Sequence, residues 1–106
     1  MTITIFLGDD LRVVCPIDVK EGVPAPSVRF YRGKRELKDD TRTRIIHKEQ
    51  GSALNINKAR FTDESKYTVV VEQDGIPVDQ ATFSVFVKGL FAAVEVWHSV
   101  NHKSVK

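Results

Sequence analysis

The fold is decided by the stretch Asp63-Glu64-Ser65-Lys66-Tyr67-Thr68-Val69-Val70-Val71. Its side chains at Tyr67, Val69 and Val71 recur at every second residue, which is the period of a β-strand with one buried face. The run is followed by Asp74-Gly75, a dipeptide that favours a tight hairpin turn. We therefore expect this strand to pair with a second strand over residues 78–87.

The same alternation recurs upstream. The clearest example is a strand in which alternate side chains share one face: Leu11, Val13, Cys15 and Ile17. Val28 and Phe30 both face inward on the next strand. Residues 45–46 and 54–56 are typical of two strands that pair as a hairpin. Seven or eight short strands with no long helix between them predict an all-β antiparallel sandwich rather than a parallel sheet.

Length and composition fit one modest domain. The chain has 106 residues, of which 42% are hydrophobic and 28% are charged, and its formal net charge of +2 favours no polyanionic partner. The alternating pattern stops at Lys88-Gly89, so we expect a domain over residues 1–88 and a tail or linker over residues 89–106.

No apolar run approaches the ~20 residues of a membrane span, and the first ten residues lack the pattern of a secretory signal. We expect neither a membrane segment nor export.

The pattern of residues 89–106 does not select one conformation. One set of side chains would line a helical face: Leu90, Ala93, Val94 and Trp97. Another set alternates as in a strand: Val94, Val96, His98 and Val100. A short helix, an extra strand and a disordered segment therefore stay open. An exposed Trp97 would make docking or self-association through this tail worth testing.

Four segments occur in an order that carries a family resemblance. They are Gly8–Cys15, Val28–Leu37, Ser52–Ile56 and Asp63–Val69. They are similar to the B strand, the C strand with its turn, the E strand and the start of the F strand of an immunoglobulin domain of the intermediate (I-set) type, as in titin, twitchin, myosin-binding protein C, myomesin and obscurin. The resemblance covers residues 2–88 and implies an immunoglobulin-like β-sandwich of two antiparallel sheets connected as a Greek key.

Two core positions differ from that family. Val69 stands where the family has its second core cysteine, so the resemblance implies no core disulfide and a reduced thiol at Cys15, as a reducing compartment allows. Phe30 stands where the family has tryptophan. A disulfide of this kind would contribute roughly 4 kcal/mol, so packing must replace it. The implied structural core is Cys15, Phe30, Leu54, Tyr67 and Val69.

The resemblance also implies two polar contacts at the base of the sandwich. Tyr67 should form a tyrosine corner, with its ring in the core and its hydroxyl group on a backbone carbonyl a few residues upstream. Asp63 should form a salt bridge with Arg44 or Arg42.

The sequence offers little support for catalysis, a metal or a cofactor. Cys15 lies on the inward-facing side of its strand, and none of the neighbouring family-like segments contains a histidine that could activate it. This indicates a structural thiol. His98 and His102 could share a helix face, but no further ligands complete a metal site. Asp9-Asp10 and Asp39-Asp40 are adjacent pairs, and adjacent residues of a strand point to opposite faces. We expect a non-enzymatic domain.

Basic side chains concentrate over residues 29–48, which contain eight lysines and arginines but only three acidic residues. This predicts a positive edge that could meet an acidic protein surface, with these residues as contact candidates: Arg29, Arg32, Arg35 and Arg42. A solvated edge that prevents sheet-to-sheet aggregation is the alternative. Only Tyr31 could stack on a base among these charges, so nucleic-acid binding is a remote alternative.

The resemblance implies a structural and protein-binding module of an intracellular muscle or cytoskeletal filament-associated protein, located in the cytoplasm at the sarcomere or cytoskeleton. Its partners would be other sarcomeric or cytoskeletal proteins, or neighbouring immunoglobulin or fibronectin type III modules. An extracellular adhesion or receptor domain is the main alternative. Such a domain would usually keep both cysteines, and no asparagine here begins an N-glycosylation acceptor.

Overall fold

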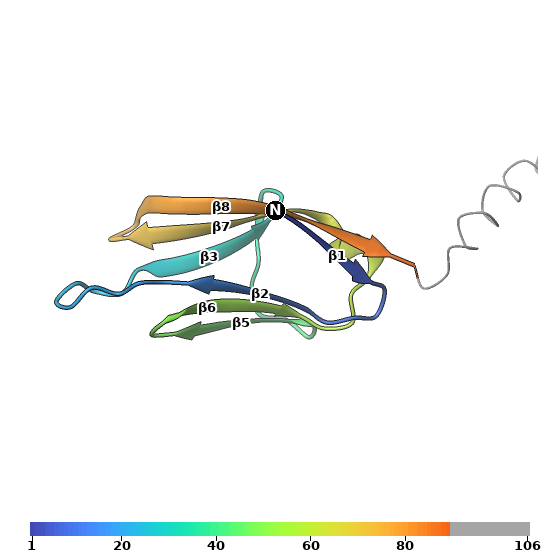
Figure 1. Ribbon diagram of the computed structural model, residues 1–106, viewed down its shortest axis with the longest axis horizontal. Helices are drawn as coiled ribbons and strands as arrows, with labels where there is room; N and C mark the ends of the chain where they lie inside the picture. Colours follow the sequence, from blue (N-terminus) through green and yellow to red (C-terminus); the bar gives the residue numbers. More distant parts are fainter. Residues whose placement is uncertain (90–106) are drawn as a thin grey trace, which may run out of the picture.

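The computed structural model describes residues 1–89, which form two β-sheets packed face to face (Figure 1). In chain order the elements are β1 (Thr2–Phe6), β2 (Leu11–Pro16), β3 (Ser27–Arg32), β4 (Arg35–Glu36), β5 (Thr43–Lys48), β6 (Gly51–Ile56), the 3-10 turn η1 (Phe61–Asp63), β7 (Ser65–Gln73) and β8 (Ile76–Lys88). One sheet has the order β1-β8-β7-β3-β4 and the other β2-β6-β5. The expected all-β sandwich is confirmed.

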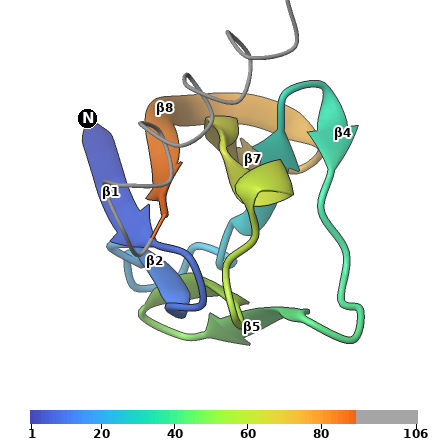
Figure 2. The same ribbon diagram turned by 90° about the vertical axis from the view of Figure 1, so that its right-hand side faces the viewer.

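Strand β1 departs from the expected antiparallel arrangement. It runs parallel to β8, with Thr2 opposite Ser84 and Phe6 opposite Lys88. Backbone hydrogen bonds from Ser84 to Met1 (3.0 Å) and from Leu7 to Lys88 (2.7 Å) lie at the two ends of this ladder. Figure 2 shows β1 and β8 side by side, with β4 at the opposite edge of the sheet. The chain crosses from β1 directly to β2, so no hairpin turn imposes antiparallel pairing with β8.

The core lies between the sheets and follows the alternation in the sequence. Phe30 and Val69 are opposite each other on β3 and β7, and both are buried. Tyr67 stacks on Phe83 with ring centroids 5.4 Å apart and an interplanar angle of 8°. Leu54 lies in the facing sheet and has no exposed surface. These side chains fill the space between the layers by packing alone.

Cys15 lies on β2 opposite Ser52 and is only partly buried, with its side chain packed against the core. It is the one cysteine of the chain, so no disulfide links the sheets. Burial raises the pKa of the thiol, and the charge of Asp79 raises it further. The group is therefore held in its protonated, unreactive form at neutral pH.

Gly51 occupies a position where any side chain would force the backbone of β2 to shift. Its φ angle is 148°, and a Cβ atom there would lie 2.5 Å from the carbonyl oxygen of Cys15 and 2.9 Å from Cα of Pro16. We predict that Gly51→Ala destabilises the fold by about 1–3 kcal/mol, because β2 must move away from β6. Thermal unfolding followed by circular dichroism measures this loss.

Gly89→Ala is the matched control, since a Cβ atom there would make only an ordinary contact, 3.8 Å from Cζ of Phe61. Equal melting temperatures for the Gly51 variant and the wild type would contradict the close approach of β2 to β6.

Candidate functional site

The most constrained polar group of the sandwich is the carboxylate of Asp63, whose side chain is 1% exposed. It ends η1, the turn that leads from β6 to β7. The backbone N–H of Arg60 donates to Asp63 Oδ2 at 2.8 Å, and the N–H of Asp63 donates to the carbonyl of Arg60 at 2.9 Å. The hydroxyl group of Tyr67 donates to the backbone carbonyl of Asp63. This is the tyrosine corner that the resemblance implied.

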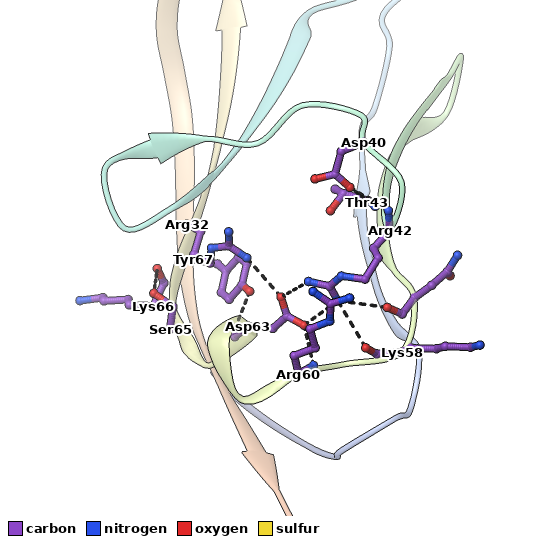
Figure 3. Close-up of polar contacts among 11 residues, drawn as sticks. Arg32, Asp40, Arg42, Thr43, Lys58, Arg60, Asp63, Ser65, Lys66 and Tyr67 are labelled. Atoms are coloured by element: carbon purple, nitrogen blue, oxygen red, sulfur yellow. Dashed lines mark hydrogen bonds and ion pairs between the residues drawn. The ribbon is translucent and has the colours of Figure 1, made fainter.

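Two arginines from different parts of the chain converge on this carboxylate (Figure 3). Arg42, just before β5, donates from Nη1 to Oδ2 and from Nη2 to Oδ1, both at 3.0 Å. Arg32, at the end of β3, donates from Nη1 to Oδ1 at 3.2 Å. Arg42 also donates to the carbonyl oxygens of Asn57 (3.1 Å) and Lys58 (3.3 Å). We call Asp63, Arg32, Arg42, Arg60 and Tyr67 the Asp63 cluster.

Electrostatics keep the carboxylate of Asp63 ionised. Burial by itself raises the pKa of Asp63, but the hydrogen bonds from Arg42 and from the Arg60 backbone, with the charges of Arg42 and Arg32, outweigh burial and lower it below 3.8. Asp63 in turn raises the pKa of Arg42, and burial raises that of Tyr67. The cluster therefore links the β3 sheet and the approach to β5 through charge-assisted hydrogen bonds.

Of the two arginines expected to pair with Asp63, Arg42 forms the salt bridge, and the pairing with Arg44 is wrong. Thr43 is buried, so the alternation of β5 puts Arg44 on the outer face of the three-stranded sheet, opposite Asn55. Arg42 precedes the strand, and its side chain extends beneath the sandwich to Asp63.

Four of the eight cations of the predicted basic edge are paired with carboxylates within the domain. Arg29 pairs with Glu36 (3.3 Å) and Glu72 (3.1 Å), and Lys38 also pairs with Glu36 at 3.0 Å. Arg32 and Arg42 belong to the Asp63 cluster. Within residues 1–89, the cations of this stretch without an ion-pair partner within 4.0 Å are Lys34, Arg35, Arg44 and Lys48. Of the four candidate contact residues, only Arg35 is left unpaired.

The structure contains a second basic surface that was not predicted from the sequence. Arg12, Asn55 and Arg44 stand in register across β2, β6 and β5, and Arg12 Nη1 donates to Asn55 Oδ1 at 3.0 Å. We call these three residues the outer basic row. They line a shallow depression of about 560 Å³ that Asp10 and Asp40 also border. Arg12 lies outside the basic stretch of the sequence, so only the strand register could have revealed this row.

No catalytic arrangement was found among the described residues. His47 Nδ1 lies 2.7 Å from the hydroxyl oxygen of Ser52, and Ser52 is opposite Cys15 on β2. Residues 1–89 contain no group of three or more His, Cys, Asp or Glu side chains that could hold a metal ion, and no helix long and apolar enough to cross a membrane. Trp97, His98 and His102 lie outside the described residues.

We predict that Asp63→Asn lowers the free energy of unfolding at pH 7 by on the order of 3 kcal/mol, because it removes one partner of a buried ion pair. The folded-state pKa of Asp63 is below its unfolded value of about 3.8, so its contribution to stability is complete only at pH values well above 3.8 and declines as the pH falls toward the folded-state pKa. The stability difference between wild type and variant should therefore narrow below pH 4. Urea unfolding at several pH values measures it.

Arg44→Gln is the control for this cluster, because Arg44 is exposed and makes no contact with Asp63. Its unfolding midpoint should match that of the wild type. A difference between wild type and Asp63→Asn that is small at neutral pH, or that does not change with pH, would contradict the described charge pairing.

Comparisons with known proteins agree with this geometry. The chain matches the family model for the immunoglobulin I-set domain over residues 2–88. Hemicentin-1 from Mus musculus is 31% identical over 68 residues, which is 64% of this chain but 1% of hemicentin-1. The chain thus corresponds to a very small part of that relative.

Several solved structures share the fold. A chimeric titin Z1Z2 has a TM-score of 0.72 at 24% identity, covering 83% of this chain and 87% of that one. The M1 domain from titin has a TM-score of 0.70 at 22% identity over 85% of this chain and 91% of that one. The twitchin kinase region from C. elegans has a TM-score of 0.71 at 18% identity over 82% and 15% of the two chains. With the sandwich, the tyrosine corner and a family match over residues 2–88, the chain belongs to the immunoglobulin I-set family.

Proposed function

We propose that this domain is a non-enzymatic structural and protein-binding module of an intracellular muscle or cytoskeletal filament-associated protein, where it transmits tension and docks neighbouring proteins. The observation that carries this proposal is the parallel pairing of β1 with β8, the first and last strands of the domain. Tension applied to the two ends would pull β1 and β8 in opposite directions along their own axes. The hydrogen bonds between them would then be loaded together in shear rather than one after another.

The core supports a location in a reducing compartment. Val69 and Phe30 are buried in the core against which Cys15 packs, no disulfide links the sheets, and the thiol is held protonated. A fold that is stable through packing and the Asp63 cluster does not depend on an oxidising environment. We therefore place the domain in the cytoplasm, at the sarcomere or cytoskeleton. The extracellular alternative would have to tolerate the loss of the disulfide that such domains usually keep.

The docking surface that we propose is the outer basic row together with Arg35. Arg29, Arg32 and Arg42 are occupied by internal carboxylates, so their charge is largely compensated. Arg12 and Arg44 flank an amide on an exposed sheet face and suit an acidic protein segment. Sarcomeric or cytoskeletal proteins, or neighbouring immunoglobulin or fibronectin type III modules, are the proposed partners. Nucleic acid is disfavoured because no exposed aromatic ring accompanies Arg12 and Arg44 in the depression.

The tension-bearing role predicts a specific effect of Ile5→Pro. Leu7 donates its N–H to β8, and N–H groups alternate in direction along a strand, so Ile5 also donates toward β8. Proline removes that donor. In a tandem array stretched by atomic force microscopy, the Ile5→Pro domain should unfold at a lower force than the Ile5→Ala domain, which loses side-chain packing but keeps the hydrogen bond. Equal unfolding forces for the two variants would remove the support for shear loading of β1 and β8.

The docking role predicts that charge reversal of the outer basic row weakens attachment to filaments. The double variant Arg12→Glu/Arg44→Glu should be retained several-fold less than the wild type in co-sedimentation with isolated myofibrils, and wild-type retention should fall with added salt. Lys20→Glu/Lys66→Glu carries the same change in net charge at exposed positions outside the row and serves as control. Failure of the wild type to sediment with myofibrils, or equal loss in both double variants, would refute this docking surface.

A further inference from the structure

Three phenylalanine rings are exposed at the end of the sandwich where β1 and β8 finish. Phe6 is 51% exposed, Phe86 47% and Phe61 56%, whereas Phe30 and Phe83 are buried. Apolar surface gathered on one part of a folded domain usually marks a contact site. We call Phe6, Phe61 and Phe86 the basal patch.

The register of the sheet shows that two of these rings are neighbours. Thr4 is opposite Phe86 and Phe6 is opposite Lys88 in the parallel β1–β8 ladder. Side chains two residues apart on a strand share a face, so Phe6 and Phe86 lie diagonally next to each other on the outer face of the five-stranded sheet. A Cβ atom on Gly89 would lie 3.8 Å from Cζ of Phe61, so the third ring lies against the residue that follows β8.

The point where the chain leaves the domain is firmly fixed beside this patch. Leu7 donates its N–H to the carbonyl of Lys88 at 2.7 Å, and the N–H of Val87 donates to Glu64 Oε1 at 2.9 Å. These bonds hold the last residues of β8 between β1 and η1. The segment after Gly89 therefore starts next to the basal patch.

The sequence that follows is suited to cover these rings. Residues 90–97 read Leu-Phe-Ala-Ala-Val-Glu-Val-Trp, with one charged side chain, Glu95. Phe86 lies about 10 Å along the strand from Gly89. Eight residues reach roughly 12 Å as a helix and roughly 26 Å when extended, so Trp97 can reach the patch with either periodicity. Lys88 is exposed on the same sheet face as Phe6 and Phe86, where it could meet Glu95.

We propose that residues 90–97 of this chain dock on the basal patch, with the indole of Trp97 against Phe6 and Phe86. The domain would then include part of the tail, and the direction in which the chain continues to any further module would be set by this contact. The inference does not depend on the proposed function. It rests on the exposed rings, the fixed exit at Gly89 and the apolar sequence that follows.

Trp97 is the only tryptophan of the chain, so its fluorescence reports on this contact alone. In the full chain, the emission of Trp97 should be blue-shifted, and its quenching by acrylamide several-fold weaker, relative to a synthetic peptide of residues 90–106. Phe6→Ser/Phe86→Ser should shift the emission to the red and raise quenching toward the peptide value. Val78→Ser is the matched control, because Val78 is 61% exposed on β8 but lies away from the patch.

Circular dichroism establishes that each variant is folded, and Phe6→Leu/Phe86→Leu, which keeps apolar surface, should retain most of the protection. Peptide-like emission in the folded wild type would overturn the proposal. Protection that disappears on dilution would also overturn it, because the occupant would then be a second copy. An equal response to Val78→Ser and to the double serine variant would do the same.

Discussion

The carboxylate of Asp63 is the group on which the arrangement of this domain depends. A charge with 1% exposure is unfavourable unless opposite charges and hydrogen-bond donors surround it, and Asp63 receives them from Arg42, Arg32 and the Arg60 backbone. Its backbone carbonyl accepts the hydroxyl group of Tyr67, so the same residue also fixes β7. Through its side chain and its backbone carbonyl, this one residue in η1 thus connects β3 and β7 of the five-stranded sheet with the approach to β5 of the three-stranded sheet.

This constraint changes how the basic stretch contributes to function. Three of the four arginines that the sequence offered as contact candidates are used internally, because Arg42 and Arg32 hold Asp63 while Arg29 pairs with Glu36 and Glu72. The partner surface that we propose is therefore the outer basic row on the three-stranded sheet, together with Arg35. The absence of a disulfide at Cys15 adds to the importance of the cluster, since noncovalent contacts alone keep the two sheets together. The proposed docking surface thus uses other arginines than the ones that hold Asp63.

Local periodicity was sufficient to predict the strands and the inward-facing residues. Tyr67 and Val69 are buried at alternate positions as predicted, and Asp74 and Gly75 both have positive φ angles at the predicted hairpin turn. Local periodicity could not predict which segments far apart in the sequence come into contact. The parallel direction of β1 follows from the path of the chain between sheets, and the choice of Arg42 over Arg44 follows from the residue at which β5 begins. Likewise, no local pattern brings Arg12 beside Asn55, 43 residues later.

A direct test of the central claim is the titration of the Asp63 carboxyl carbon by nuclear magnetic resonance in the intact chain. If two arginines and a backbone N–H compensate its burial, the titration midpoint will lie below the ordinary value of 3.8. A midpoint at or above that value would mean that burial prevails. The arginines and the backbone N–H would then give the ionised carboxylate no net stabilisation on folding, which would contradict the account.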